Sequence, residues 1–490
     1  MSDGRLSVRF CRRTLPEDWF ADPVRLTARI GKAFDPAGAG GTLWLDSAEP
    51  GPVRTDRGPI GRRSIWMAGP IDRIDAVPDD RDALAVGWAE LRRWCERLPQ
   101  TDRAPGVGGV AGVIGYEAAT HLLPVHAAAL PTPGGGIAVG LYDWAIVRDH
   151  VSNTQELIVW DWHPRGMERR AEEILQRLSN HPFEDKTDTP IIDRPDPSPT
   201  DPLRHRPMTG FATPEAAVHS DFSSNGFGDA IAAIVQGVHN GDTFQVNLAQ
   251  QLIGTTARPA LDVYRSLRTS NPAPLGGYFD AGGYQVLSTS PEVLIEVTDG
   301  AVESRPIKGT VPRTGDDRVD AQAAARLSTN AKERAENIMI VDLMRNDLSP
   351  VCVDDSVMVE QTCGVERYAR VQHLVSVVRG RLRPDMTAHD ALVAAFPGGS
   401  VTGAPKVAAM RAIADTEPHR RGAYCGSMGF VTPSARPGGD ATWNILIRTM
   451  TIADGEARLP VGGGITARSV PDDEVAETWT KASAMLSAIR

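Results

Sequence analysis

Residues 284–304 read Tyr-Gln-Val-Leu-Ser-Thr-Ser-Pro-Glu-Val-Leu-Ile-Glu-Val-Thr-Asp-Gly-Ala-Val-Glu-Ser, and this stretch decides the fold class. Its apolar runs at 284–288, 293–297 and 301–304 predict three strands. Asp299-Gly300 between the last two strands is a hairpin turn signal. Strands joined by such short connections pair antiparallel. We therefore expect a β-meander here and an α+β protein with mostly antiparallel sheets.

The rest of the chain repeats this mixture of short strands and helices. Further strand-like runs lie at 41–47, 64–68, 136–142, 156–160, 244–250, 423–432, 443–452 and 457–462. Helical spacing of apolar residues predicts helices at 82–94, 166–179, 227–238, 320–348, 387–395 and 472–490. No internal repeat interrupts this order, which is consistent with the α+β prediction.

A proline-rich stretch divides the chain. Six prolines between 190 and 207, mixed with Asp, Ser, Thr and Arg, exclude a helix interior or a central strand there. We interpret 183–212 as a linker or long surface loop. This interpretation predicts an N-terminal subdomain over 1–182 and a catalytic domain over 213–490.

Composition excludes several classes of protein. The 490 residues hold 52 Lys plus Arg and 62 Asp plus Glu, a net charge of −10, which argues against a nucleic-acid-binding protein. No apolar run approaches the roughly 18 residues that span a bilayer, and no secretory signal is visible. The five cysteines have no C-x-x-C spacing. We expect a cytoplasmic protein without a structural zinc site.

Two predicted helices each carry a pair of glutamates. Glu333 and Glu336 are three residues apart, as are Glu474 and Glu477, and Lys481 follows four residues later. Residues at this spacing share one helix face. Together the pairs could hold Mg²⁺, which prefers oxygen ligands. The alternative is two solvated helix faces with ordinary ion pairs.

Glycine-rich turns and one lysine are further candidates. The segments 398–406 and 461–466 could bind an anion through backbone amides, or could be simple tight turns. Lys308 lies between Ile307 and Gly309. A desolvated lysine can act as a nucleophile, although most lysines are surface residues.

Taken together, the motifs of the C-terminal part resemble those of the chorismate-utilising enzymes. This family includes the synthase subunits for anthranilate and aminodeoxychorismate and, more distantly, isochorismate and salicylate synthases. The matching stretches are 244–250, 290–292, 306–310, 336–348, 371–376, 403–406, 424–429, 447–448, 462–465 and 477–478. The N-terminal half is similar only at 45–47, 61–64 and 115–117. The resemblance implies two large, mostly antiparallel sheets packed as a sandwich with helices outside.

The resemblance also implies roles for individual residues. Glu336 and Glu477 would ligate Mg²⁺, with Glu333 and Glu474 holding metal-bound waters, and the metal would grip the ring carboxylate of chorismate. His373 would lie near the leaving hydroxyl. The substrate-binding positions implied by the resemblance are Gly309, Thr310, Ser400, Tyr424, Arg448, Gly462, Gly463, Gly464 and Lys481.

Lys308 separates the branches of this family. The anthranilate branch usually has Ala in the Pro-Ile-x-Gly-Thr motif, whereas the aminodeoxychorismate branch usually has Lys. The resemblance therefore implies amination of chorismate at C4 through a covalent Lys308 adduct, with Glu292 as general acid or base, for p-aminobenzoate and folate synthesis. The enzymes that add water use a lysine where this chain has Gln245. The rival hypotheses are anthranilate synthesis and a noncatalytic regulator that binds chorismate or tryptophan.

Two further expectations concern partners and ligands. None of the five cysteines lies in the Gly-x-Cys-x-Gly setting of a class I glutaminase nucleophile, so we expect ammonia from a separate glutaminase subunit or from solution. Ser47, Arg62 and Pro274 match positions at which relatives bind tryptophan. A packed sandwich core without a ligand is the alternative at those positions.

Overall fold

The computed structural model describes residues 10–54, 58–101, 108–162, 166–183, 212–213, 218–223, 225–368 and 370–490. The linker predicted over 183–212 therefore lies, except for its two end residues, outside the described residues. Across the described ranges, no helix combines the length and apolar character needed to cross a membrane.

The larger sheet contains thirteen strands within the described residues, and all its strand pairs are antiparallel. Its order is β1 (Phe10–Thr14), β10 (Thr154–Trp160), β9 (Trp144–Asp149), β5 (Arg63–Met67), β2 (Thr42–Asp46), β14 (Gly276–Asp280), β15 (Gln285–Ser288), β24 (Thr449–Ala453), β25 (Glu456–Ile465), β13 (Gln245–Thr255), β12 (Val218–Ser220) and β11 (Ala212–Thr213), with β21 (Gly403–Ala404) paired to β13.

The smaller sheet contains ten strands within the described residues and is antiparallel as well. Its order is β18 (Ile307–Pro312), β20 (Val371–Arg381), β17 (Ala301–Arg305), β16 (Val293–Thr298), β23 (Asp440–Asn444), β22 (Ser427–Thr432), β7 (Gly109–Ile114), β8 (Ile137–Tyr142) and β6 (Asp72–Ala76), with β19 (Met358–Arg367) also paired to β20. A separate hairpin pairs β3 (Val53–Arg54) with β4 (Gly58–Pro59).

The two sheets pack face to face. Leu43 and Val286 of the larger sheet share one buried apolar cluster with Val113 and Met428 of the smaller sheet. Both sheets draw strands from before and after the proline-rich stretch, so each crosses the boundary between the two predicted domains. The predicted α+β sandwich is confirmed.

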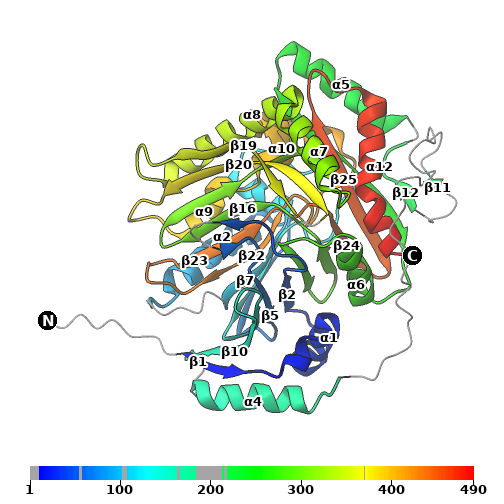
Figure 1. Cartoon of the computed structure of the whole chain (residues 1–490). Coiled ribbons are helices and arrows are strands. Elements are labelled where there is room, and N and C mark those ends of the chain that lie inside the picture. Colours follow the sequence, from blue (N-terminus) through cyan, green and yellow to red (C-terminus); the bar gives the residue numbers. More distant parts are fainter. Residues whose placement is uncertain are drawn as a thin grey trace.

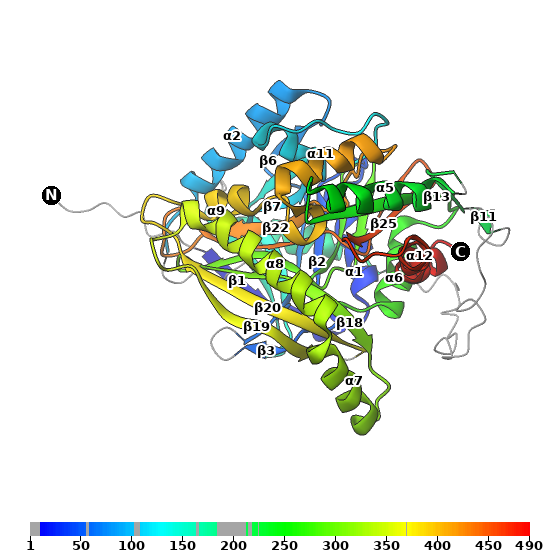
Figure 2. The ribbon, with the colours of Figure 1, turned by 90° about the horizontal axis from the view of Figure 1, so that it is seen from above.

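Helices cover the outer faces of the sandwich (Figures 1 and 2). Those packed on the larger sheet are α1 (Pro23–Phe34), α4 (Met167–Ser179), α6 (Ala260–Ser270) and α12 (Pro471–Ala488). Those packed on the smaller sheet are α2 (Arg81–Arg97), α7 (Asp317–Thr329), α8 (Ala331–Leu348) and α9 (Ala388–Ala395). The helices α5 (Gly226–Asn240) and α11 (Lys406–Thr416) pack on β13. The short helices are η1 (Glu17–Phe20), η2 (Tyr116–Ala118), α3 (Ala119–Leu122), η4 (Ser349–Val351) and α10 (Gly399–Thr402).

The predicted three-stranded meander over 284–304 is wrong in one respect. The hairpin of β16 and β17 forms as expected, and both Asp299 and Gly300 take positive φ angles at its turn. However, β15 lies in the larger sheet, between β14 and β24. The chain therefore changes sheets between Ser288 and Val293. The apolar pattern did not reveal this change, because a buried strand has the same pattern in either sheet.

The strand predicted over 443–452 is divided in the same way. Its first residues belong to β23 in the smaller sheet and its last residues to β24 in the larger one. Since β23 pairs with β16 and β24 pairs with β15, the two crossovers run side by side. This arrangement brings residues 289–292 and 445–448 together.

The single helix predicted over 320–348 is two helices. Asn330 takes an extended conformation (φ −67°, ψ 109°), and its side chain accepts hydrogen bonds from the amides of Lys332 and Glu333. An Asn cap of this kind ends one helix and begins the next. One side of α8 faces solvent, since Ile338 is 42% exposed while Ile340 is buried.

Candidate active site

The two neighbouring crossovers join through their backbones. The amide of Ile445 donates to the carbonyl of Glu292 at 3.0 Å, and the amide of Thr289 donates to the carbonyl of Arg448 at 3.1 Å. Arg448 takes a positive φ of 50°, which is uncommon for a residue other than glycine. These contacts fix Glu292 and Arg448 at the junction of the two sheets.

Glu292 is a buried carboxylate with few partners. Its Oε1 accepts a hydrogen bond of 2.7 Å from the Ser400 hydroxyl and one of 3.3 Å from the amide of Ile307. Burial raises the pKa of Glu292 to about 7, although the Ser400 hydrogen bond and the charges of Lys308 and Arg448 favour the ionised form. A carboxyl group that titrates near neutral pH can donate or accept a proton in catalysis.

Lys308 is the second residue of β18, which lies next to Glu292. Gly309, with a φ of 77°, forms a bulge after it, so that Lys308 lies opposite Leu374 while Thr310 lies opposite His373. Within the described residues, no carboxylate comes within ion-pair distance of the Lys308 ammonium, and no hydrogen bond to it is formed. Its charge nevertheless favours the ionised forms of Glu292, Glu336 and Glu477, and so opposes the rise that burial causes in the pKa values of the first two. The lysine therefore lies among three carboxylates without being bound to any of them.

His373 is fully buried beside Thr310. Its Nδ1 lies 2.8 Å from the Thr310 hydroxyl, and its Nε2 has no hydrogen-bond partner in the described part of the chain. Burial, together with the charge of Arg448, lowers the pKa of His373 to about 3. The imidazole is therefore neutral at pH 7, with one nitrogen free to bind a ligand.

Arg448 and Tyr424 complete this side of the site. Desolvation lowers the pKa of Arg448, although the charge of Glu292 opposes the shift. No protein acceptor for its guanidinium is present among the described residues. Tyr424 is 5% exposed and lies in the same apolar cluster as Ile445, with the Arg421 guanidinium 6.0 Å from the centre of its ring. A half-buried guanidinium without a carboxylate partner suits an anionic ligand.

Helix α8 brings two of the predicted metal-binding carboxylates to this region. Glu336 is partly buried, and its Oε1 has no hydrogen-bond partner in the described residues. Burial raises the pKa of Glu336; Lys308 opposes this shift, whereas Glu333 adds to it. A Cβ atom on Gly309 would lie 3.1 Å from Glu333 Oε2, so Glu333 reaches the β18 bulge.

The other two predicted carboxylates come from α12. Glu474 is buried and pairs with Lys332 at 3.5 Å. Glu477 pairs with Lys481 at 2.8 Å, and Lys481 also donates to the carbonyl of Gly462. Burial opposes ionisation of Glu477, but the charges of Lys481 and then of Lys332 hold its pKa below the usual range. Lysine ammoniums therefore lie among the four glutamates.

These side chains offer the chemistry of a magnesium site without forming one as they stand. In the described ranges, no three His, Cys, Asp or Glu side chains are placed to hold a metal ion together. The available donors are carboxylate oxygens, as Mg²⁺ prefers, and Glu336 Oε1 is a buried acceptor without a donor. Glu474 also acts on Glu336 electrostatically and raises its pKa.

The glycines of β25 lie along β13, where Gly462 has no room for a side chain and Gly464 has little. A Cβ atom on Gly462 would lie 2.4 Å from the carbonyl oxygen of Leu248. A Cβ atom on Gly464 would lie 3.0 Å from the side-chain amide of Gln245. Gln245 is fully buried, and neither its Oε1 nor its Nε2 has a partner in the described residues. Gln245 belongs to the 244–250 motif, in which the sequence alone indicates no ligand-binding role for it.

The three residues of the predicted tryptophan pocket also come close together. A Cβ atom on Gly61 would lie 2.0 Å from the Pro274 carbonyl oxygen and 2.7 Å from Ser47 Oγ. Ser47 Oγ is buried and has no partner in the described residues. The neighbouring Arg62 pairs with Asp149 at 2.8 Å. These positions therefore lie near one another, and whether they form a tryptophan pocket or a packed core stays a prediction.

Comparison with known proteins defines the class of protein to which this fold and site belong. The family model described as chorismate binding enzyme matches residues 43–487. The chain therefore belongs to the chorismate binding enzymes.

Individual relatives cover most of the chain. Aminodeoxychorismate synthase component 1 of Salmonella typhimurium is 36% identical over 394 residues, which are 79% of this chain and 78% of the relative. Anthranilate synthase component 1 of Streptomyces coelicolor is 37% identical over 441 residues, which are 87% of this chain and 83% of the relative. The crystal structure of anthranilate synthase component I from Streptococcus pneumoniae aligns with a TM-score of 0.71 and 30% identity, covering 87% of this chain and 92% of that one.

Proposed function

We propose that this enzyme aminates chorismate at C4 with ammonia to give 4-amino-4-deoxychorismate, a precursor of p-aminobenzoate and folate. The observation that carries the proposal is Lys308. It lies among Glu292, Glu336 and Glu477, acts on all three electrostatically, and is bound to none of them. A lysine held in this way is available to a substrate.

The reaction would take place in two displacements. In the first, Lys308 passes its ammonium proton to Glu292, the resulting amine forms a bond to C2 of the ring while the C4 hydroxyl leaves, and Glu292 donates the proton that converts this hydroxyl to water. In the second, ammonia forms a bond to C4 while the bond between Lys308 and C2 breaks, and Glu292 takes up a proton again. A carboxyl group with a pKa of about 7 is suited to both roles.

The charged groups of the substrate would be divided between two sides of the site. Arg448, the backbone of Gly463 and Gly464, and Tyr424 would hold the enolpyruvyl carboxylate. On the other side, Glu336 and Glu477 would ligate Mg²⁺, with Glu333 and Glu474 holding its waters. When bound, the metal would neutralise the ring carboxylate as a Lewis acid.

Ammonia would come from a separate glutaminase subunit or from ammonium in solution. All five cysteines are buried and form no disulfide, and none has the surroundings of a class I glutaminase nucleophile. The relatives named component 1 also carry a name that presupposes a second component. This supports a two-subunit enzyme in which the present chain performs the amination.

Anthranilate synthesis is the second candidate. Relatives that carry this name are as similar to the chain as the aminodeoxychorismate synthases are. The two reactions differ in the carbon that ammonia attacks and in whether pyruvate is eliminated. Lys308 favours attack of ammonia at C4. Only that route needs an enzyme nucleophile in the place of Lys308, because the lysine must first bond to C2.

Product analysis with Lys308 variants tests the proposal. The purified enzyme with chorismate, Mg²⁺ and ammonium chloride should give 4-amino-4-deoxychorismate, measured by liquid chromatography and mass spectrometry. Lys308→Ala should remove most of this rate, by up to about 10⁶-fold, because the nucleophile is lost. Lys308→Arg keeps the charge and should be equally inactive.

Three outcomes would contradict the proposal. Fluorescent anthranilate as the direct product would show the second candidate to be correct. An unchanged rate in Lys308→Ala would reject the covalent step, whatever the product. Tight binding of chorismate without turnover, at saturating ammonium and Mg²⁺, would favour a noncatalytic regulator. Mass spectrometry of the ammonia-starved enzyme with chorismate should reveal an adduct on Lys308.

A further inference from the structure

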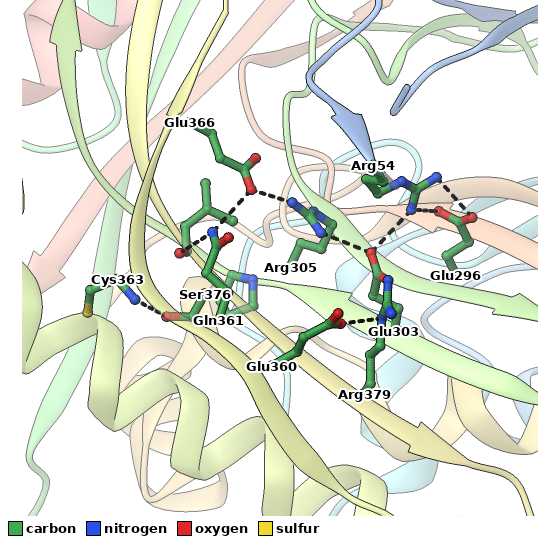
Figure 3. A network of polar contacts seen from close by, with 12 residues as sticks. Arg54, Glu296, Glu303, Arg305, Glu360, Gln361, Cys363, Glu366, Ser376 and Arg379 are labelled. Carbon is green, nitrogen blue, oxygen red and sulfur yellow. Dashed lines mark hydrogen bonds and ion pairs between the residues drawn. The ribbon is translucent and has the colours of Figure 1, made fainter. Parts of the chain in front are cut away.

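A cluster of buried ion pairs lies on the smaller sheet (Figure 3), and it includes Arg305, three residues before Lys308. At its centre is Glu303 on β17, which is fully buried and bonds to three guanidiniums. The distances are 3.2 Å from Arg54, 3.1 Å from Arg305 and 2.7 Å from Arg379. Although burial opposes ionisation, these arginines hold the pKa of Glu303 below its usual range.

One arm of this cluster reaches the β3–β4 hairpin. Arg54, the last residue of β3, donates to both carboxylate oxygens of Glu296, at 2.7 and 3.2 Å, and its side chain is only 10% exposed. Its Nε donates to the carbonyl of Gly58 in the opposite strand of the hairpin. Arg54 is therefore the polar link between the hairpin and the ten-stranded sheet.

The other arm reaches β19 and the active-site strand. Arg305, three residues before Lys308, bonds to both Glu303 and Glu366. Glu366 lies directly opposite His373 in the pairing of β19 with β20, and His373 lies directly opposite Thr310 in the pairing of β18 with β20. Directly opposed residues share one face of a sheet. Glu366, His373 and Thr310 therefore form one row.

Tyr368, two residues after Glu366, packs against the His373 imidazole. Its ring meets the ring of His373 edge to face, with centroids 5.1 Å apart and planes at 70°. Burial, and then the neighbouring charge of Glu366, raises the pKa of Tyr368. A Cβ atom on Gly51, which precedes β3, would lie 3.1 Å from Tyr368 Cε1. The segment leading into the hairpin thus reaches Tyr368 as well.

We propose that the chain of contacts from Arg54 through Glu303, Arg305 and Glu366 positions His373 for the reaction. Glu366 fixes the edge of the β19–β20 ribbon at the point where His373 projects. Tyr368 packs against the imidazole, so the orientation of its unpartnered Nε2 depends on this edge. Because Arg54 bonds both to the β3–β4 hairpin and to Glu303, the orientation of His373 also depends on the position of this hairpin. These are positioning residues and do not touch the substrate.

The proposal rests on the proposed function for its kinetic readout, and Glu366→Gln tests it. Gln keeps the shape of Glu366 but weakens the ion pair with Arg305. We expect kcat with chorismate, Mg²⁺ and saturating ammonium to fall about 10-fold, with KM for chorismate changed less than about 2-fold, because orientation rather than binding is lost. Arg54→Gln, at the far end of the chain, should lower kcat in the same direction but less.

Glu360→Gln is the matched control. Glu360 is also on β19 and also pairs with an arginine of the cluster, Arg379, at 2.7 Å, but it lies away from His373. The kcat of the Glu360→Gln variant should equal that of the wild type. In a His373→Asn background, Glu366→Gln should have no further effect on kcat. Equal effects of the two Gln variants, or an undiminished effect of Glu366→Gln without His373, would overturn the proposal.

A measurement without turnover separates this proposal from the proposed function. Carbon-13 NMR of enzyme labelled at histidine Cε1, with the His373 signal assigned through His373→Asn, reports the surroundings of the imidazole directly. Glu366→Gln should shift this signal and Glu360→Gln should leave it in place. An unmoved signal in Glu366→Gln would refute the positioning role, even if the product proves to be anthranilate.

Discussion

Glu292 and Glu303 are buried carboxylates on either side of β16, and their surroundings are opposite. Glu303 is bonded to three arginines, which hold its pKa below the usual range. Glu292 receives a hydroxyl and a backbone amide, and burial raises its pKa to about 7. Two cations act on Glu292 electrostatically, namely Lys308 and Arg448, and neither is bonded to it.

The difference distinguishes a structural charge from a reactive one. A buried charge must be compensated, and at Glu303 the protein itself completes the compensation. At Glu292 the compensation is incomplete, and the neighbouring His373 Nε2 and Glu336 Oε1 are also without partners among the described residues. Groups left in this state inside a protein indicate a site that a ligand completes. The following predictions test this distinction.

The largest expected effect is on stability, at Glu303. Glu303→Gln leaves the guanidiniums of Arg54, Arg305 and Arg379 without their shared carboxylate, and breaking a buried pair on one side costs about 3–5 kcal/mol. The free energy of unfolding, measured by urea denaturation at pH 7, should fall by this amount. The control Glu360→Gln removes a carboxylate that is 52% exposed and should change it by less than about 0.5 kcal/mol. Equal losses in both variants would show that the cluster is not structural.

The next effect is smaller and depends on pH. Because the folded pKa of Glu292, about 7, exceeds the ordinary value of 4.5, the folded protein holds an extra proton between these pH values. Glu292 therefore lowers stability as pH rises from about 5 to about 7. Glu292→Gln should have wild-type stability near pH 4.5 and become more stable than the wild type by up to about 3 kcal/mol above pH 7.

In this experiment the stability of Glu292→Gln must be compared with that of the wild type at each pH. Burial also raises the pKa values of Glu117 and Asp221 to about 7, so the wild type alone would show their titration as well. The difference between variant and wild type cancels these contributions. A difference that does not change with pH would mean that Glu292 is ionised throughout this range, as Glu303 is. Despite its greater stability, the variant should lose most of its amination activity.

The sequence predicted much of the fold because its local patterns agree with the final structure. The Asp299-Gly300 turn and the spacing of apolar residues in α2 and α5 each identify an element without reference to the rest of the chain. The patterns could not predict the sheet to which a strand belongs. A strand buried between two sheets has the same apolar sequence in either sheet, so the crossovers at 289–292 and 445–448 were not visible.

The sequence motifs named the candidate residues and their expected roles, but not how these residues are buried and paired. The motifs identified Glu292, Lys308 and Ser400, and the structure brings these three together. The sequence could not show that Gln245 is buried without a partner, or that Lys332 and Lys481 lie among the four glutamates. Burial and pairing arise from segments far apart in the chain, and spacing along the chain carries no information about them.

The smallest expected effect is on the pKa of Glu292 when the Ser400 hydroxyl, which donates a hydrogen bond to it, is removed. Ser400 donates to Glu292 Oε1 at 2.7 Å and lowers the pKa that burial has raised. Ser400→Ala should therefore raise the pKa of Glu292 by about one unit, since a hydrogen bond to a charged group contributes about 1.5 kcal/mol or more. The dependence of kcat/KM on pH, which reports the free enzyme, should show the limb near pH 7 displaced upward. Ser304→Ala removes a buried hydroxyl beside Glu303 that donates to Met344 instead, and it should leave the limb in place. If both variants shift the limb equally, the change arises from packing and the hydrogen bond to Glu292 does not control its ionisation.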